Sequence, residues 1–413
     1  MFLLKRDYFN KTFIIKGLCT ALLFSAFLYL AYFDFEVKII NTITGLLALY
    51  FLLTIPRISL FYAGFFIGIL WFYWVSFSFV YYELYYLMPI IVLGMGVAYG
   101  VIFLLLGLVN HPLFRVFSIM LLSYFEPFGF NWLKPELLFV QSYFSTTKLV
   151  LLLLLIATYS LYKGSRSIYA LLLTAIFFIS FYIQKPNESL VKSDLNIAMS
   201  QLFVKQEEKW EHDNLSNIIK TNFSHIEQAI LEGKDLVILP ETAFPMLLNL
   251  DQLVLNMLLE KSKEITIVTG ALYKENGNYN NSTYLFQNGD YQVAHKVVLV
   301  PFGESVPLPE KIKNFINDVF YDGAKDYSKA NEPTDFVIDS ERFRNAICYE
   351  ATSSEIYKNL GNTKYLIVTS NNAWFSPSIE PILQKMLLRY FAKKHHVIIY
   401  HVANGSSNAI IRP

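Results

Sequence analysis

Charged residues are distributed very unevenly along this chain of 413 residues. Residues 1–184 contain 17 of its 67 Asp, Glu, Lys and Arg residues, and residues 185–413 contain the other 50. The first part consists mainly of long apolar runs, and a helix needs about 20 such residues to cross a bilayer core of about 30 Å. The sequence therefore predicts a helical membrane domain over 1–184 and a soluble domain over 185–413.

Seven apolar runs are candidate membrane spans: residues 12–33, 37–55, 58–82, 87–109, 112–130, 147–163 and 166–184. The fifth is the weakest, because Arg115 and Glu126 interrupt it, and it can instead be a short span followed by an interfacial segment as far as Trp132. The first run follows Lys11 and has no small-residue cleavage site, so we expect it to be a retained anchor and not a cleaved signal peptide.

The charges between these runs predict the orientation. With seven spans, one side receives a group in which Asp7 is the only acid: Lys5, Arg6, Lys11, Arg57, Arg115, Lys163 and Arg166. The other side receives a more acidic group: Asp34, Glu36, Glu83, Glu126 and Glu136, with Lys38, Lys134 and Lys148. Because cytoplasmic loops carry an excess of Lys and Arg, the N-terminus is predicted to be cytoplasmic and the soluble domain extracytoplasmic.

The overall composition argues against several classes of partner. The 34 basic and 33 acidic residues almost cancel, so the chain has no strong field to attract nucleic acid. The sequence contains no H-E-x-x-H motif, no paired-cysteine metal spacing and no G-x-x-x-x-G-K phosphate loop. We therefore predict no metal, no cofactor and no nucleic-acid partner.

The soluble half alternates short apolar runs with helical patterns, which is typical of a layered α/β domain. Strands are predicted over 194–200, 235–240, 265–271, 283–287, 344–349, 364–370 and 397–402. Between the first two, apolar residues recur at spacings of three and four from Leu215 to Ile230, which predicts an amphipathic helix.

Two ionisable residues stand where predicted strands end or turn. Glu241 follows an apolar strand and lies between Pro240 and Pro245. Burial there would raise its pKa and suit it to be a general base, although an acid at a helix start is the simpler interpretation of Glu241 alone. Lys296 precedes an apolar run and a turn that carries Glu304. Its ammonium can hold an oxyanion, but a solvated strand-edge lysine is the simpler interpretation of Lys296 alone.

Cys348 is one of only two cysteines, and Cys19 lies in the first apolar run, so the two are not expected to pair. A lone cysteine in an oxidising compartment needs burial or a function. Cys348 stands at the end of an apolar strand with Glu350 two residues further on. It is therefore either a small buried hydrophobic residue or a presented nucleophile.

Glutamate, lysine and cysteine in this order at strand ends resemble the catalytic triad of the nitrilase superfamily. With apolar runs in front, the chain resembles the apolipoprotein N-acyltransferases, bacterial enzymes that add the third acyl chain to lipoproteins. Further matching elements are Gln201 with Trp210, Pro301-Phe302-Gly303-Glu304, Cys348-Tyr349-Glu350, Ser370-Asn371-Asn372-Ala373-Trp374-Phe375 and Asn404-Gly405.

This resemblance implies an α-β-β-α sandwich as the catalytic domain and ping-pong acyl transfer as the activity. It implies that Cys348 is the nucleophile, Glu241 the base and Lys296 the oxyanion ligand. The implied supporting residues are Glu304 beside the lysine, Tyr349, Glu350 and Trp210 in the pocket, and Trp374 in a lid.

The resemblance also implies substrates and a location. The implied acyl donor is a phospholipid, phosphatidylethanolamine, and the acceptor is a diacylated apolipoprotein. The implied location is the bacterial inner membrane, with the catalytic domain on the periplasmic side, and we expect a monomer.

Two features depart from the family pattern. Asn372 stands where the family usually has Asp, and the sequence ends at Pro413 where many members have a final membrane span. We therefore expect the terminal strands and the last helix to be absent or severely shortened, and the C-terminus to lie outside the cytoplasm.

Two rival functions remain open. One is a membrane-anchored carbon–nitrogen hydrolase (an amidase or nitrilase), although seven spans exceed what an anchor needs. The other is a non-catalytic binding or transport protein, against which the intact Glu241, Lys296 and Cys348 argue.

Overall fold

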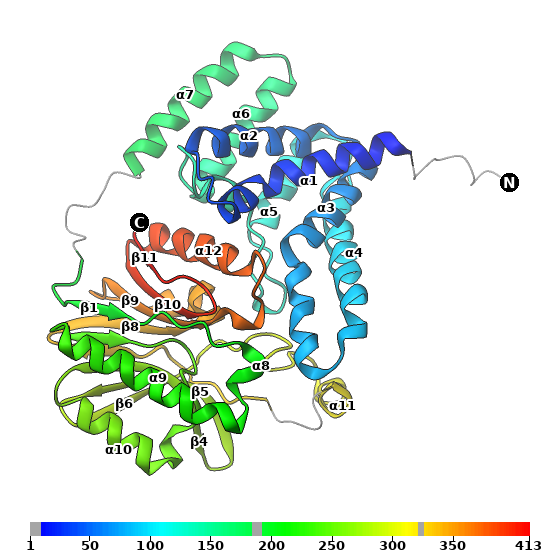
Figure 1. Cartoon of the computed structure of the whole chain (residues 1–413). Helices are drawn as coiled ribbons and strands as arrows, with labels where there is room; N and C mark the ends of the chain where they lie inside the picture. The colour runs from blue at the N-terminus through cyan, green and yellow to red at the C-terminus, as the bar shows by residue number, and fades with distance from the viewer. Residues whose placement is uncertain (1–9, 184–191, 321–325) are drawn as a thin grey trace. The chain divides into compact units, whose positions relative to one another are not determined.

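The computed structural model describes residues 10–183, 192–320 and 326–413, and it divides into two compact units (Figure 1). The helical unit comprises Met1–Glu126, Trp132–Lys185 and Ser378–Tyr390, and the α/β unit comprises Pro127–Asn131, Pro186–Pro377 and Phe391–Pro413. The predicted domain boundary between residues 184 and 185 lies outside the described residues, as do Lys5, Arg6 and Asp7.

Each predicted apolar run overlaps one α-helix of the helical unit: α1 (Lys11–Tyr32), α2 (Lys38–Thr54), α3 (Arg57–Phe72), α4 (Met88–Leu106), α5 (Pro112–Leu122), α6 (Lys148–Tyr162) and α7 (Arg166–Ile183). Among the described residues, 4 helical stretches are long and apolar enough to cross a membrane: Lys11–Tyr32, Arg57–Tyr82, Tyr85–Leu106 and Arg166–Ile183. The helices α2, α5 and α6 are shorter, so the seven-span topology stays a prediction.

The fifth apolar run forms a much shorter helix than a continuous span over 112–130 requires. Helix α5 has only 11 residues, and a span needs about 17–25. The proline at position 127 disfavours helical geometry in the residue before it. The segment Pro127–Asn131 then belongs to the α/β unit.

Glycines allow α3 and α4 to pack closely. A Cβ atom on Gly64 would lie 2.2 Å from the Tyr99 carbonyl oxygen, and one on Gly68 would lie 2.5 Å from that of Met95. Both distances are too short for any larger side chain. Small residues at helix contacts are typical of membrane bundles, where close packing replaces the hydrophobic effect.

Arg115 is buried and caps the C-terminal end of the neighbouring helix α2 with hydrogen bonds. Its Nη1 donates hydrogen bonds to the carbonyl oxygens of Leu52, Leu53 and Ile55 at 3.4, 3.0 and 2.6 Å. The last carbonyls of a helix have no partner within the helix, so the guanidinium satisfies this end of α2. Arg115 therefore lies at the same end of the helical unit as Arg57, which begins α3.

Two β-sheets form the centre of the α/β unit. The first has the order β1-β2-β4-β5-β6, with β3 paired to β4, and the second has the order β11-β10-β9-β8-β7. The first sheet contains β1 (Ile197–Met199), β2 (Leu236–Ile238), β3 (Phe244–Leu247), β4 (Thr266–Glu275), β5 (Asn278–Gln287) and β6 (Asp290–His295). The second contains β7 (Asp335–Ile338), β8 (Glu341–Ile347), β9 (Tyr365–Asn371), β10 (Ile398–Asn404) and β11 (Ala409–Ile411).

The two sheets face each other across one apolar core. Ile238 and Val268 of the first sheet belong to the same buried cluster as Phe343, Ile367 and Val402 of the second. The outer face of the first sheet is covered by α9 (His212–Leu231) and α10 (Gln252–Lys261) (Figure 1). The predicted fold class, a helical membrane region followed by a layered α/β domain, is therefore confirmed.

Three further α-helices and eight 3-10 helices lie within the described residues. The α-helices are α8 (Gln206–Lys209), α11 (Glu310–Phe320) and α12 (Glu380–His395). The 3-10 helices are η1 (Tyr73–Tyr82), η2 (Tyr85–Leu87), η3 (Pro127–Gly129), η4 (Pro135–Phe139), η5 (Leu248–Leu250), η6 (Cys348–Thr352), η7 (Ser354–Tyr357) and η8 (Asn372–Trp374).

The strand predictions succeed where apolar runs are continuous. Each predicted strand overlaps an observed one, and the predicted amphipathic helix is α9. The predictions omit β3, β6, β7 and β11. All four strands are short, and β6 is largely exposed. An apolar stretch of this length is too short to indicate a strand by its periodicity.

Candidate active site

Glu241 lies on a tight turn shortly after the buried strand β2, with Leu239 and Pro240 between them. The turn is held by a hydrogen bond from the Gly270 amide to the Pro240 carbonyl oxygen at 3.2 Å. The next residue, Thr242, has a φ of 46°, in the left-handed region. Glu241 is only 7% exposed. A carboxylate on such a turn is positioned by the backbone and shielded from water.

Gly270 of β4 provides the space for this turn. A Cβ atom there would lie 2.4 Å from the Thr242 nitrogen and 2.7 Å from the Glu241 Cα. We expect Gly270→Ala to displace Glu241 and lower the rate of the reaction at this site about 10- to 100-fold, since a displacement of about 1 Å at a reacting group can cost 100-fold. Steady-state kinetics with matched protein amounts check this. An unchanged rate in the folded variant would contradict the role assigned to the turn.

Lys296 directly follows β6 and is fully buried, with 0% exposure. Its Nζ donates to the Glu304 carboxylate at 2.9 Å and lies 3.9 Å from Glu241 Oε1. Asn281 Nδ2 joins the two carboxylates, donating to Glu241 Oε1 at 2.7 Å and to Glu304 Oε1 at 3.0 Å. The alternative of a solvated strand-edge lysine is therefore wrong.

The charge on Lys296 is maintained by its neighbours. Burial disfavours the ammonium, but Glu304 and Glu241 outweigh this effect and raise the pKa of Lys296 above its usual value. Lys296 is therefore a cation at neutral pH. A buried, fixed positive charge is suited to stabilise a developing oxyanion.

Cys348 lies where β8 ends and η6 begins, on the second sheet. Its φ is 53°, a conformation that costs energy for a non-glycine residue and is often found at functional sites. Its side chain interacts electrostatically with Lys296. Neither Cys348 nor Cys19 forms a disulfide among the described residues. The structure thus brings all three predicted triad residues to one site.

Glu350 connects the lysine segment to the cysteine turn. It is 1% exposed, and its Oε2 accepts the amides of Val297 at 2.6 Å and Val298 at 3.0 Å. Its Oε1 accepts the Ile347 amide at 2.8 Å, immediately before Cys348. Burial raises the pKa of Glu350 to about 7, although Lys296 and these three amides act in the opposite direction. Glu350 therefore fixes the spacing between Lys296 and Cys348.

Tyr349 holds a segment that precedes the soluble half in the sequence. Its hydroxyl donates to the Gly129 carbonyl oxygen at 2.8 Å, and its ring stacks on Phe130 with a centroid distance of 6.3 Å. The neighbouring Phe128 contacts Phe302 edge to face at 6.0 Å. The α/β unit thus includes Pro127–Asn131 beside the cysteine turn.

The two predicted tryptophans occupy different surroundings. Trp210 is 47% exposed at the end of α8, and Trp374 is half-buried in η8, directly after β9. Their roles in the pocket and the lid stay predictions. Asn372, which replaces the usual Asp, is buried and donates through Nδ2 to Ser406 Oγ at 3.0 Å.

Two polar residues at this site were not predicted. Asn281 joins Glu241 to Glu304, and Lys209 donates through Nζ to the Glu241 carbonyl oxygen at 3.1 Å. The pair Asn280-Asn281 within an otherwise strand-like segment is a signal that could have found the first, since Asn is depleted in strands. Lys209 directly precedes Trp210 in the sequence but has no pattern of its own.

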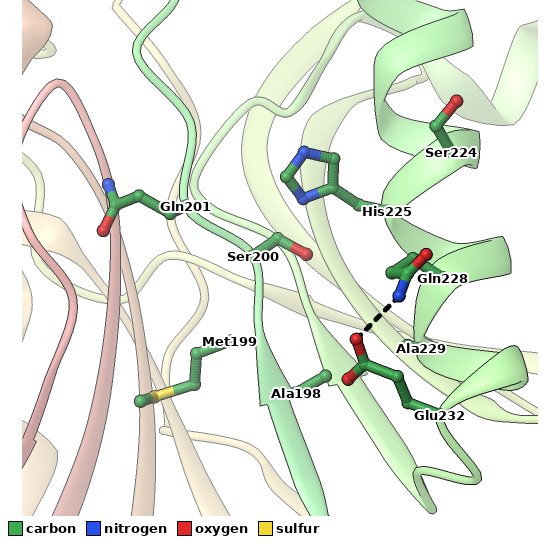
Figure 2. A pocket seen from close by; sticks show the side chains of 9 residues that line it. All are labelled: Ala198, Met199, Ser200, Gln201, Ser224, His225, Gln228, Ala229 and Glu232. Carbon is green, nitrogen blue, oxygen red and sulfur yellow. Dashed lines mark hydrogen bonds between the residues drawn. The ribbon is translucent and has the colours of Figure 1, made fainter.

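A surface cavity of about 220 Å³ lies elsewhere, between β1 and α9. Figure 2 shows its lining residues, among them His225, Gln228 and Glu232, with Gln228 donating to Glu232 at 2.8 Å. None of the predicted catalytic residues lines this cavity. It is therefore separate from the site formed by Glu241, Lys296 and Cys348.

Comparisons with known proteins identify the family. The family model described as the apolipoprotein N-acyltransferase integral membrane domain matches residues 11–184. The apolipoprotein N-acyltransferase of Wolinella succinogenes is 44% identical over 394 residues, covering 95% of this chain and 94% of the relative. This chain belongs to the apolipoprotein N-acyltransferase family. The prediction of an acyltransferase is therefore confirmed.

Further relatives agree with this assignment. The apolipoprotein N-acyltransferases of Campylobacter jejuni and Helicobacter pylori are 35% and 39% identical, covering 97% and 90% of this chain and 90% and 88% of the relatives. The chain is thus an integral membrane protein with several candidate spans and with bacterial relatives. A solved CN-hydrolase superfamily structure from Xanthomonas campestris is also similar, with 16% identity, a TM-score of 0.41, and coverage of 54% of this chain and 83% of that one.

Proposed function

We propose that this chain moves a fatty acyl group from a membrane phospholipid, through a thioester on Cys348, to the N-terminal α-amine of a diacylglyceryl-cysteine apolipoprotein. The observation that carries this proposal is the convergence of Glu241, Lys296 and Cys348, with Lys296 3.9 Å from Glu241. Family membership supports the acceptor, and the apolar helical unit suits two lipid substrates.

In the first half-reaction, Glu241 takes the proton from the Cys348 thiol. The thiolate attacks the ester carbonyl carbon of the phospholipid, and the Lys296 ammonium stabilises the resulting oxyanion. When the intermediate collapses, the ester C–O bond breaks. Glu241 returns the proton to the leaving glycerol oxygen, so that a lysophospholipid departs and the acyl group remains as a thioester.

In the second half-reaction, the α-amine of the apolipoprotein attacks the thioester carbonyl. Glu241 takes a proton from the attacking amine, and Lys296 again holds the oxyanion. Collapse of the intermediate breaks the C–S bond, forms the amide and releases Cys348, which recovers its proton from Glu241. Water must stay out between the two steps, because hydrolysis of the thioester would release the acyl group as a free fatty acid.

The phospholipid donor is proposed to be phosphatidylethanolamine, cleaved at its sn-1 chain, and all catalytic residues come from one chain, as a monomer requires. The catalytic domain is proposed to lie on the periplasmic side of the bacterial inner membrane. An ion pair between Arg389 Nη1 and Glu36 Oε2 at 3.4 Å supports this side. It places the Ser378–Tyr390 segment of the helical unit beside the turn between α1 and α2, which the loop charges assign to the outside.

Intact-mass analysis of the purified protein tests this function. The protein is incubated with phosphatidylethanolamine, and a diacylated lipopeptide with a free α-amine is then added. We expect a hydroxylamine-sensitive mass increase of one acyl group, which then moves to the peptide amine. Protein alkylated beforehand with iodoacetamide is the control and should gain no acyl group.

The same experiment separates the rival functions. A thioester that decays only to free fatty acid, with or without the lipopeptide, would identify a hydrolase. Folded protein that never gains an acyl group would identify a non-catalytic protein.

A further inference from the structure

A second buried lysine lies at the catalytic site and has no part in the proposed reaction. Lys209 is 2% exposed, and its Nζ donates to the main-chain carbonyl oxygen of Glu241 at 3.1 Å. Burial lowers the pKa of Lys209 to about 7, and Glu241 and Cys348 act in the opposite direction, so negative charge on these two groups favours the protonated lysine. A lysine is very rarely fully buried without a partner or a function.

The segment that carries Lys209 is held by buried amide side chains. Gln206 begins α8, and its Oε1 accepts Asn371 Nδ2 at 2.8 Å. Asn371 Oδ1 in turn accepts Asn404 Nδ2 at 2.9 Å, and Asn404 Oδ1 accepts the Val204 amide at 2.8 Å. Asn371 and Asn404 end the neighbouring strands β9 and β10. The position of Lys209 therefore depends on β9 and β10 of the second sheet. Its hydrogen bond goes to the Glu241 turn, which follows β2 of the first sheet.

The charges at the site give Lys209 a role. Three buried or nearly buried carboxylates, Glu241, Glu304 and Glu350, act on Lys296 together with Cys348. Lys296 is one positive charge among these acids, and formation of a Cys348 thiolate adds a further negative charge. A nearby positive charge favours the charged form of a thiol, so a second cation makes the thiolate easier to form.

We propose that Lys209 is a positioning residue that holds the Glu241 turn through its carbonyl oxygen and supplies the second positive charge beside Cys348. This rests on the proposed role of Cys348 as nucleophile. Lys209 exchanges no proton with substrate. The thiol proton still goes to Glu241, and Lys209 stabilises the thiolate that remains.

The pH dependence of Cys348 alkylation tests this proposal. Cys19→Ser provides the background, because Cys348 is then the only remaining thiol of the 2 in the chain. Adding Lys209→Met removes both the hydrogen bond and the charge. We expect the apparent pKa of Cys348 to rise by about one unit, so that iodoacetamide alkylation at pH 7 slows about tenfold. In acyl transfer, kcat falls by a similar factor while KM for the phospholipid stays the same.

Two further variants separate charge from packing. Lys209→Gln keeps a donor for the Glu241 carbonyl oxygen without the charge, and we expect the same shift in the alkylation profile. Lys205→Met removes an exposed lysine four residues earlier, which pairs with Glu208, and should leave the profile unchanged.

The outcomes distinguish this proposal from the proposed function. An unchanged alkylation profile in folded Lys209→Gln overturns the role of Lys209 while wild-type acyl transfer stands. Loss of folding in both Lys209 variants also overturns it, because Lys209 would then be required for the fold itself. Absence of a thioester on wild-type Cys348 overturns the proposed function.

Discussion

Replacing Cys348 with serine is expected to lower the rate of acyl transfer about 10⁴-fold or more, which is the typical effect of removing a catalytic nucleophile. Glu241 can deprotonate a thiol, whose ordinary pKa is about 8.5, but not a serine hydroxyl, which is a far weaker acid. No hydroxylamine-sensitive acyl group should form on the variant. Intact-mass analysis after incubation with phospholipid, together with the transfer assay, measures both effects.

The chain contains its own control for this substitution. Cys19 lies on α1 in the helical unit, and Cys19→Ser is expected to retain both the acyl adduct and wild-type transfer. Full activity of Cys348→Ser would refute the thioester mechanism. Loss of the acyl adduct in Cys19→Ser but not in Cys348→Ser would show that Cys19 carries the acyl group. This result would also refute the thioester mechanism at Cys348.

Glu350→Gln is expected to have the second largest effect, with transfer reduced about 100-fold or more, as for a displacement of about 1 Å at a reacting group. Both carboxylate oxygens of Glu350 accept main-chain amides, from Val297, Val298 and Ile347. A glutamine places a donor against at least one of these amides, so a buried donor loses its acceptor at a cost of about 1–3 kcal/mol. The segments of Lys296 and Cys348 then lose their fixed spacing.

Transfer kinetics and thermal unfolding of the wild type and of Glu350→Gln measure the losses of activity and stability. Glu355→Gln is the matched control, because Glu355 is exposed in η7 and forms a surface ion pair with Lys358 at 2.8 Å. Surface pairs of this kind contribute about 0–1 kcal/mol. Wild-type transfer by folded Glu350→Gln would contradict the spacing role.

The pH dependence of stability gives a further check on Glu350. Its pKa in the folded protein, about 7, is above the usual value of 4.5, so the folded protein binds this proton more tightly than the unfolded chain. The stability contributed by this group is therefore fully present below pH 4.5 and is lost as the pH rises through 7. The stability difference between wild type and Glu350→Gln should shrink across this interval. A difference that grows with pH in thermal unfolding would contradict burial as the dominant influence.

Local patterns in the sequence were sufficient for the broad architecture. The long apolar runs predict a helical region because a bilayer core sets the length and polarity of a span. Short apolar runs predict β2, β4, β9 and β10 because a buried strand has few polar side chains. Glu241 and Cys348 were proposed because each follows such a run, Lys296 because it precedes one, and their order resembles a known triad.

Other features depend on contacts between residues far apart in the sequence. The separation between Glu241 and Lys296 follows from the pairing of β2, β4, β5 and β6, and Cys348 reaches them from a second sheet. The placement of Pro127–Asn131 also depends on such distant contacts. This segment precedes two predicted spans in the sequence but belongs to the α/β unit. No local pattern records such a contact.

The sequence by itself determined the two-part architecture and the family, and it predicted the residues of the proposed triad, because hydrophobic periodicity and short motifs are properties of neighbouring residues. Only the tertiary structure decided that Lys296 is fully buried between two carboxylates and that Glu350 joins the two catalytic segments. It also decided that the Lys209 ammonium donates a hydrogen bond to the main-chain carbonyl oxygen of Glu241. The physical reason is that burial and electrostatic environment are set by which distant segments pack together, and these quantities control the reactivity of an ionisable group.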